Sequence, residues 1–349
     1  MRVYPTILAS GIPALLLFCL PGAPTVSARD GDNAIQAQHR GELHLFVLAG
    51  QSNMSGRGKL LNQPVDSSIY LFGNDGKWKL AREPLDSCEN QLDQVSCDQG
   101  AGTGPGLAFA LELRKLRPDM AIGLIPCAKG ATTIFEWDRR MAPDSLYGNC
   151  LLRIRAASDM GAIKAVLFLQ GEWDALGPSY WDRLLLPNHR LPDKLPQQRV
   201  RYRVLEPGED SGQAARETEQ KQRYESSPEQ SKIIVSLHSD PVRGWNRAMP
   251  DIWGTIFEDF VIGLRHDLGR PELTILLAQI GDNHNPDAYT HWSMVQSQQE
   301  ALSSKGVIMI RTRGLPLRDN VHFTAESSIE IGKRFARAYL DKEGPDSRD

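Results

Sequence analysis

The sequence predicts a single α/β/α domain in which helices cover both faces of a parallel β-sheet. Short, almost wholly apolar runs recur along the chain, which is typical of strands buried on both faces, and the first run is Leu43–Ala49. Segments with apolar residues at helical spacing alternate with these runs. This alternation favours right-handed strand–helix–strand crossovers, and therefore a parallel sheet.

Composition indicates a soluble globular protein. The chain has 349 residues, of which 41% are hydrophobic and 24% are charged, and its formal net charge is -3. This length is enough for one large domain with a substantial core. The balanced charge argues against disorder and against a polyanionic partner, so no nucleic-acid partner is expected.

Residues 1–28 have the pattern of a secretory signal peptide. Arg2 supplies a positive charge, residues 7–20 form an apolar core, and Val26-Ser27-Ala28 is a small-x-small cleavage site. A membrane anchor is the alternative, but the apolar run is short and is broken by glycine and proline. We therefore expect a secreted or periplasmic protein that has no membrane segment after cleavage and begins with a polar leader at 29–41.

Cleavage would leave four cysteines, Cys88, Cys97, Cys127 and Cys150, in a chain that enters an oxidising compartment. Three pairings are possible. We favour Cys88–Cys97 with Cys127–Cys150, because each bond would close a short segment, and free buried thiols are the alternative. The cysteine spacing matches no zinc-binding motif, so we expect no metal bound by cysteine.

Ser52 follows the first predicted strand in the segment Gly50-Gln51-Ser52-Asn53-Met54. Gly50 permits a sharp change of direction, so Ser52 should lie in a tight turn at the carboxyl end of the strand, where open α/β sheets place their ligands. Its hydroxyl could be a nucleophile, or Ser52 could simply cap a helix. The choice depends on a base, an orienting acid and oxyanion donors elsewhere in the chain.

The remaining elements follow from apolar periodicity and from turn residues. We predict strands at 69–72 and 77–80, joined as a hairpin, and at 121–127, 162–169, 273–280 and 307–310, with a further short strand at 232–238. The predicted helices lie at 107–116, 252–268, 292–303 and 324–340. A surface insertion is expected at about 176–230 and a polar tail at 341–349. Thr324 should cap the last helix. The domain itself should span 42–340.

Polar residues follow three successive predicted strands. They are Gln51 and Ser52 after the first strand, Lys129 and Gly130 after 121–127, and Gln170-Gly171-Glu172 after 162–169. Because parallel strands end at the same edge of a sheet, we expect the three turns to lie together. This edge of the sheet is the predicted site.

Asp319 and His322 lie shortly before the last helix. Histidine is suited to take a proton from a serine hydroxyl near neutral pH, and an acid three residues upstream can hold the other imidazole nitrogen. Together with Ser52, this pattern favours nucleophilic catalysis over a loop histidine.

These motifs resemble the sialate O-acetylesterase-type domain of carbohydrate esterase family six, a branch of the SGNH hydrolases. The resemblance rests on Gly-Gln-Ser-Asn-Met at 50–54, Gly130, Gln-Gly-Glu at 170–172 and Asp-x-x-His at 319–322, and it covers roughly 42–175 and 245–340. It implies a flavodoxin-like three-layer fold, metal-free serine hydrolysis without a cofactor, and removal of acetyl groups from carbohydrates.

The resemblance also implies roles for individual residues. Ser52 would be acylated and His322 would be the base, with Asp319 ranked first as its partner and Glu172 as the alternative. The Ser52 N–H, the Gly130 N–H and the Gln170 side-chain amide would bind the oxyanion. Gln51 and Asn53 would support the Ser52 turn.

The chain departs from the family pattern at two positions beside the predicted site. Ala131 stands where a second glycine is usual, which is a small change if the backbone there does not need a positive φ. Trp173 stands where the family has serine, and it could narrow the acyl pocket, stack on a sugar ring or belong to the core.

Two alternative functions remain at this stage. A secreted carbohydrate-binding protein could keep the fold without turnover, although such a protein has no need of Ser52, His322 and Asp319 together. A metal-dependent hydrolase could use Asp282, His284 and His291, but their spacing matches no familiar ligand motif. The sequence does not indicate an oligomeric state or which acetylated sugar is the substrate.

Overall fold

The computed structural model describes residues 41–177, 199–200, 234–235 and 250–344. The signal peptide at 1–28, most of the leader at 29–41, most of the 176–230 insertion and the end of the tail lie outside these residues and stay predictions. Within the described ranges, no helix has the length and apolar character that a membrane span requires.

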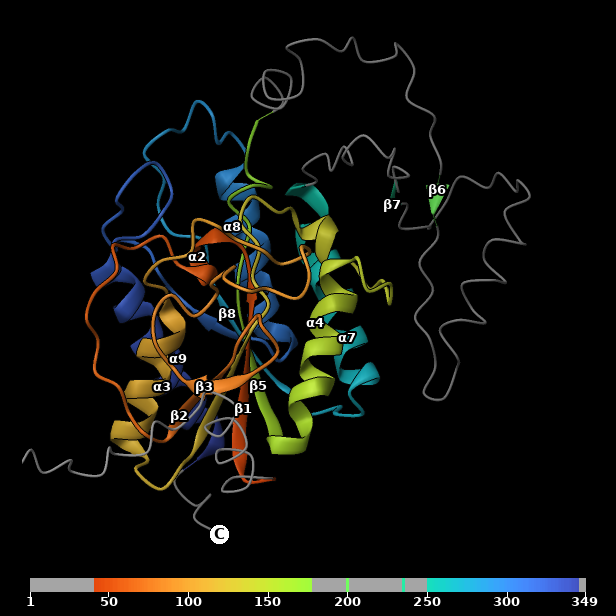
Figure 1. The fold of residues 1–349 in the computed structure, drawn as a ribbon. Helices are drawn as coiled ribbons and strands as arrows, with labels where there is room; N and C mark the ends of the chain where they lie inside the picture. The colour runs from red at the N-terminus through yellow and green to blue at the C-terminus, as the bar shows by residue number, and fades with distance from the viewer. Residues whose placement is uncertain (1–40, 178–198, 201–233, 236–249, 345–349) are drawn as a thin grey trace, which may run out of the picture.

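A seven-stranded sheet forms the centre of the molecule, in the order β3-β2-β4-β1-β5-β8-β9 (Figure 1). Its strands are β1 (Leu43–Gly50), β2 (Ile69–Phe72), β3 (Trp78–Leu80), β4 (Ile122–Pro126), β5 (Gly161–Leu169), β8 (Thr274–Ala278) and β9 (Ile308–Ile310). All neighbours are parallel except β2 and β3. Without this hairpin the order is that of flavodoxin, which confirms the predicted fold class.

Helices cover both faces of the sheet. On one face lie α3 (Pro105–Leu116) and α9 (Ala325–Glu343), and on the other lie α4 (Leu146–Ala157), α7 (Trp253–Asp267) and α8 (Trp292–Ala301) (Figure 1). Thr324 caps α9, since its side chain accepts a hydrogen bond from Ser327 N. The prediction for this helix is confirmed.

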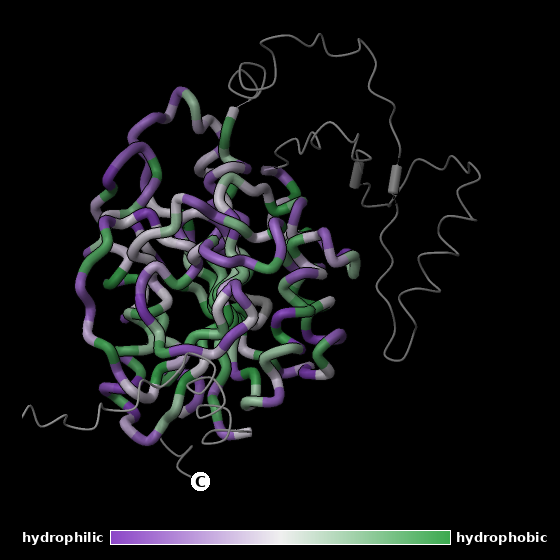
Figure 2. Tube along the Cα trace, viewed as in Figure 1, coloured by the Kyte–Doolittle hydropathy of each residue, from purple (hydrophilic) through white to green (hydrophobic). Residues whose placement is uncertain are grey.

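Two apolar cores lie between these layers, one on each face of the sheet. Residues of β1 alternate between them, because successive side chains of a strand point to opposite faces. Leu45 and Val47 pack towards α4 and α7, whereas Phe46 packs edge-on against Phe109 of α3 and Tyr339 of α9. Figure 2 shows hydrophobic residues along the central strands and hydrophilic residues on the surrounding loops.

The sequence analysis missed α4, which follows a capping serine at Ser145 and carries buried residues at helical spacing, such as Leu146, Cys150 and Ile154. The short elements were missed as well. These are α2 (Ser52–Ser55), η1 (Ile134–Trp137), η2 (Ser158–Met160), η3 (Pro250–Ile252), η4 (Leu302–Lys305) and β6 (Arg199–Val200), which pairs with β7 (Ile234–Val235) outside the central sheet.

The predicted disulfides are half confirmed. Cys88 and Cys97 are bonded, but Cys127 and Cys150 are free buried thiols, so the predicted second bond is wrong. Cys127 lies just beyond β4 and Cys150 lies in α4, and both side chains are buried in the core on that face of the sheet.

Candidate active site

The turn after β1 places Ser52 beside the end of β5. Gly50 has a φ of +131°, and a Cβ added to it would lie 2.1 Å from the carbonyl oxygen of Leu169, so only glycine fits there. Gln51 then donates its N–H to that carbonyl and precedes Ser52, the first residue of α2. The Ser52 N–H finds no acceptor among the residues that the structure describes.

Ser52, His322 and Asp319 form a continuous hydrogen-bonded series. Ser52 Oγ lies 3.0 Å from His322 Nε2, and His322 Nδ1 lies 2.8 Å from Asp319 Oδ2. Burial would raise the pKa of Asp319, but hydrogen bonds from the N–H groups of His322 and Val321 and from the imidazole hold it below the ordinary value. The ionised Asp319 can only accept, so Nδ1 carries the proton and Nε2 is free to accept from the Ser52 hydroxyl.

Asn53 joins the serine turn to the histidine loop. Its Nδ2 donates to Val321 O at 3.1 Å, and its Oδ1 accepts from Phe323 N at 3.1 Å, so it holds the residue on each side of His322. We expected Asn53 to support its own turn. Instead it connects the turn that carries Ser52 to the residues on each side of His322.

Glu172 contacts Asn53 rather than the imidazole. Its Oε1 accepts from Asn53 Nδ2, while its Oε2 is buried and has no hydrogen-bond partner among the residues that the structure describes. Burial raises the pKa of Glu172, although the hydrogen bond from Asn53 and the charge of His322 oppose this shift. Of the two candidate acids, Asp319 is therefore the one bonded to His322.

The Gln170 side chain does not reach the reaction site that the sequence predicts for it. It is fully buried, and its Nε2 donates to Gln51 Oε1, Thr132 O and Asp174 Oδ2. Its amide therefore holds the ends of β1, β4 and β5 together. Gln51 supports the turn as predicted, because its Oε1 accepts from both Gln170 and the Gly171 N–H.

The predicted Gly130 donor is also engaged elsewhere. Its N–H donates to Asp98 Oδ2 at 2.9 Å. The next residue, Ala131, has a φ of +58°, so this position does require the left-handed conformation that favours glycine. The substitution at Ala131 is therefore less neutral than the sequence analysis assumed.

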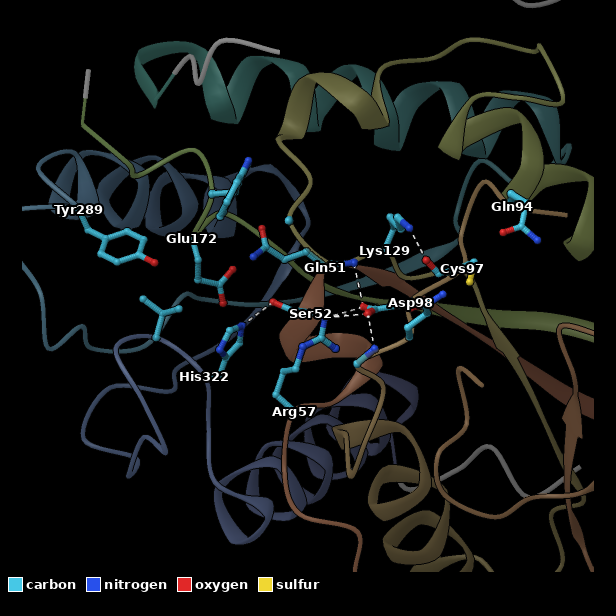
Figure 3. A pocket seen from close by; sticks show the side chains of 16 residues that line it. Gln51, Ser52, Arg57, Gln94, Cys97, Asp98, Lys129, Glu172, Tyr289 and His322 are labelled. Atoms are coloured by element: carbon cyan, nitrogen blue, oxygen red, sulfur yellow. Dashed lines mark hydrogen bonds and ion pairs between the residues drawn. The ribbon is translucent and has the colours of Figure 1, made fainter. Parts of the chain in front are cut away.

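A pocket of about 520 Å³ opens beside Ser52. In Figure 3, Tyr289, Glu172 and His322 lie on one side of Ser52, and Gln94, Cys97, Asp98 and Lys129 on the other. Trp173 lines the pocket as well, and only part of its surface is buried. The pocket therefore combines aromatic side chains with a few polar groups, as small-molecule sites do.

Comparison with known proteins places the chain in a family. A model described as carbohydrate esterase, sialic acid-specific acetylesterase, matches residues 42–199 and 245–341, which is most of the chain. The chain belongs to this carbohydrate esterase family. The resemblance drawn from the sequence motifs is thereby confirmed.

Individual relatives of this carbohydrate esterase are moderately similar. A probable carbohydrate esterase of Arabidopsis thaliana is 27% identical over 318 residues, which are 85% of this chain and 90% of that protein. An X-ray structure from Arabidopsis thaliana is 26% identical, with a TM-score of 0.56 over 85% of this chain and 98% of that one. A novel carbohydrate acetylesterase from Xanthomonas citri is 16% identical, with a TM-score of 0.49 over 84% and 55% of the two chains.

The residues of the alternative metal site make other contacts in this carbohydrate esterase. Asp282 accepts from the Gly314 N–H at 2.8 Å and lies 3.6 Å from Arg313, while His291 Nδ1 lies 3.3 Å from Leu176 O. Within the described part of the chain, no group of three or more His, Cys, Asp or Glu side chains could hold a metal ion.

Sequence reasoning missed several residues of the pocket. Arg57, Gln94, Asp98, Gln99 and Tyr289 line it but belong to no motif that we identified. The one available signal was the position of Asp98 directly after Cys97, because a disulfide can hold a neighbouring polar residue inside the fold.

Proposed function

We propose that this carbohydrate esterase is a secreted acetylesterase that removes acetyl groups from sugars through an acyl-enzyme on Ser52. The observation that carries the proposal is the Ser52–His322–Asp319 series beside a pocket of about 520 Å³. The family description and the esterase relatives support the substrate class. The sequence pattern of residues 1–28 supports secretion.

The reaction would proceed in two steps, acylation of Ser52 and then hydrolysis of the acyl-enzyme. His322 Nε2 takes the proton of Ser52 Oγ as this oxygen attacks the acetyl carbonyl carbon. The tetrahedral intermediate collapses, the sugar oxygen leaves with the proton from His322, and the acetyl group stays on Ser52. A water molecule then gives a proton to His322 as it attacks the acyl carbon, and Ser52 Oγ leaves with that proton, so acetic acid is released and ionises to acetate in solvent.

The negative charge on the carbonyl oxygen needs hydrogen-bond donors. The structure supports the Ser52 N–H, which has no acceptor within the described ranges. One such donor lowers the barrier by about 3 kcal/mol. Gly130 could serve only if its N–H left Asp98, and Gln170 only if its amide left three acceptors.

The test is hydrolysis of p-nitrophenyl acetate by the chain without residues 1–28. We expect turnover that EDTA leaves intact, and a fall in kcat of at least about 10³-fold in Ser52→Ala. Full activity in Ser52→Ala would refute the proposal. Turnover that EDTA abolishes would support the metal-dependent alternative. Sugar binding without turnover would support the binding-protein alternative. Acetate release from defined acetylated glycans would then identify the sugar.

A matched pair of variants tests the assignment of the acid. Asp319→Asn should lower kcat by about 10²- to 10⁴-fold, because the imidazole loses the acceptor that fixes its tautomer. Glu172→Gln should lower it much less, since Glu172 contacts Asn53 instead. A larger loss in Glu172→Gln would reverse the assignment, and equal small losses would refute both.

A further inference from the structure

Asp98 binds four groups around the nucleophile from a position outside the triad. Its side chain is only 6% exposed. Oδ2 accepts from Ser55 Oγ at 2.6 Å and from Gly130 N at 2.9 Å, and Oδ1 accepts from Gly100 N at 3.2 Å. Arg57 Nη2 lies 2.8 Å from both oxygens. One carboxylate thus holds five donor contacts.

These donors come from segments that form the active site. Ser55 belongs to α2, three residues after Ser52, and its Oγ also accepts from Arg57 Nη1. Gly130 belongs to the loop after β4 and lines the pocket; its neighbour Lys129 lies on the opposite side of Ser52 from His322 (Figure 3). Asp98 therefore ties the nucleophile turn to the second loop of the site.

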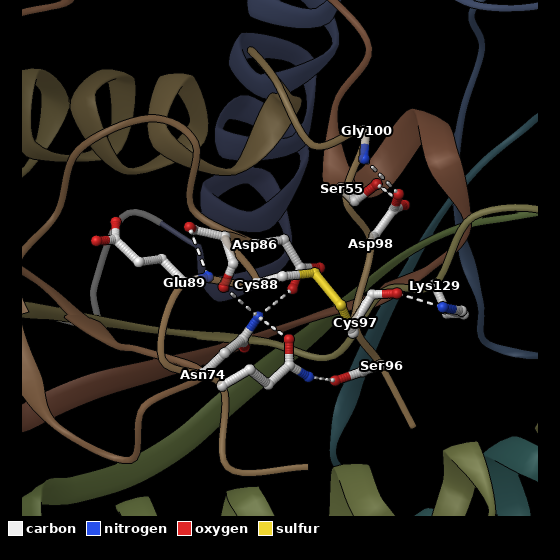
Figure 4. The surroundings of a disulfide bond; sticks show 12 residues. Ser55, Asn74, Asp86, Cys88, Glu89, Ser96, Cys97, Asp98, Gly100 and Lys129 are labelled. Atoms are coloured by element: carbon white, nitrogen blue, oxygen red, sulfur yellow. Dashed lines mark hydrogen bonds between the residues drawn. A yellow bond between two sulfur atoms is a disulfide. The ribbon is translucent and has the colours of Figure 1, made fainter. Parts of the chain in front are cut away.

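The disulfide-closed loop brings Asp98 to this position. Cys97, bonded to Cys88, directly precedes Asp98, and Lys129 directly precedes Gly130. The two pairs of residues lie side by side, because Lys129 Nζ donates to Cys97 O (Figure 4) and Gly130 N donates to Asp98 Oδ2.

Charge and space at this junction are closely matched. Burial would raise the pKa of Asp98, but the hydrogen bonds from Ser55 and Arg57 and the charge of Arg57 hold it below the ordinary value. A Cβ at Gly130 would lie 2.4 Å from Arg57 Nη2 and 2.8 Å from Asp98 Oδ2, so a larger residue there would require these two paired side chains to shift. The junction therefore leaves little freedom to either loop.

We propose that Asp98 is a positioning residue that sets the distance between the Ser52 turn and the Gly130 loop through its bonds to Ser55, Arg57 and Gly130. The inference rests on the serine mechanism proposed above. A displacement of about 1 Å in reacting groups costs up to about 10²-fold in rate. Asp98 therefore supports the chemical step without touching the substrate's acetyl group.

The chain offers a matched control in Asp267, at the end of α7. Its side chain is also 6% exposed and also bonds an arginine twice, since Arg139 Nε and Nη2 lie 2.9 and 2.5 Å from its oxygens, and it accepts from the Tyr147 hydroxyl at 2.6 Å. It does not line the pocket. Asp267→Asn thus removes a comparable carboxylate at a distance from the chemistry.

The experiment compares Asp98→Asn with Asp267→Asn in kcat, KM and thermal unfolding midpoint. The kinetics are measured with p-nitrophenyl acetate at a temperature well below both midpoints. We expect Asp98→Asn to lower kcat by about 10- to 100-fold with KM changed less than about threefold, and Asp267→Asn to keep kcat within about twofold. Equal kcat values, or a rise in KM alone, would overturn the inference.

Ser55→Ala provides a second readout if Asp98→Asn fails to fold, because it removes one hydrogen bond to Asp98 and keeps the ion pair with Arg57. We expect a fall in kcat of about three- to tenfold, equivalent to one hydrogen bond, and unchanged kcat would refute the inference. Failure of the serine mechanism would be recognised separately, since activity would then survive Ser52→Ala.

Discussion

Ala131 shows how much a single backbone angle matters beside the site. Its φ of +58° lies in the left-handed region, where the Cβ of alanine approaches the backbone unfavourably. The residue is exposed, so no buried contact of its methyl group offsets this cost. The structure thus explains why glycine is usual at this position in the family.

We predict that Ala131→Gly stabilises the protein by about 0.5–1 kcal/mol, because relief of the left-handed strain outweighs the added freedom of glycine in the unfolded chain. Chemical denaturation of the two proteins measures this difference. Ala301→Gly, at the exposed end of α8, is the control and should destabilise. A loss of stability in Ala131→Gly would show that the methyl group of Ala131 makes a stabilising contact.

At the scale of elements, the disulfide-closed loop and the ends of three parallel strands build the pocket together. β1, β4 and β5 lead into the Ser52, Gly130 and Glu172 segments, and the loop between Cys88 and Cys97 adds a wall that the sheet does not supply. Gln94 and Cys97 of this loop line the pocket, together with Asp98, Gln99 and Gly100, which follow Cys97 directly. The Cys88–Cys97 bond therefore closes the loop that forms this wall.

Removing this bond should destabilise the protein. We predict that Cys88→Ser/Cys97→Ser lowers the free energy of unfolding by about 2–3 kcal/mol, as expected for closing a loop of about ten residues. Reductant should lower the thermal midpoint of the parent and leave the double variant unchanged. After denaturation without reductant, the chain lacking residues 1–28 should titrate two thiols, Cys127 and Cys150. A count of zero thiols would show that Cys127 and Cys150 form the second disulfide after all.

Across the whole molecule, buried carboxyl groups make stability depend on pH in two opposite ways. Burial raises the pKa of Asp86 and of Asp174 to about 7 each. Hydrogen bonds and ion pairs overcome burial at Asp98 and Asp267, and they hold the pKa of Asp267 at about 2. Between about pH 4 and 7, Asp86 and Asp174 bind more protons in the folded than in the unfolded chain. Below about pH 4, Asp98 and Asp267 bind fewer protons in the folded than in the unfolded chain.

The contribution of these four groups to the free energy of unfolding should therefore rise from pH 2 to about pH 4 and fall from about pH 4 to pH 7. Asp174→Asn should flatten the second change by more than about 1 kcal/mol, since each pKa unit corresponds to 1.36 kcal/mol. Denaturant unfolding at several pH values measures this. The exposed Asp159→Asn is the control, and an unchanged slope in Asp174→Asn would refute the prediction.

Much of the fold, and the hydrogen-bonded pairing of Asp319 with His322, could be predicted because the signals are local. The strands followed from apolar runs such as Leu43–Ala49, and Thr324 followed from its place before an amphipathic helix. The same reasoning could have found α4, whose cap at Ser145 was overlooked. Asp319 and His322 were predictable as partners, because three residues of spacing let the carboxylate reach the imidazole.

The sequence alone thus determined the parallel sheet and singled out Ser52, His322 and Asp319 as candidates, since each of these inferences depends on neighbours in the chain. Tertiary structure decided which polar groups pair. The Gln170 amide and the Gly130 N–H have acceptors at Thr132, Asp174 and Asp98 that compete with any oxyanion, and Glu172 has Asn53. Such competition between distant groups is settled by distance and burial, which appear only when the chain is folded.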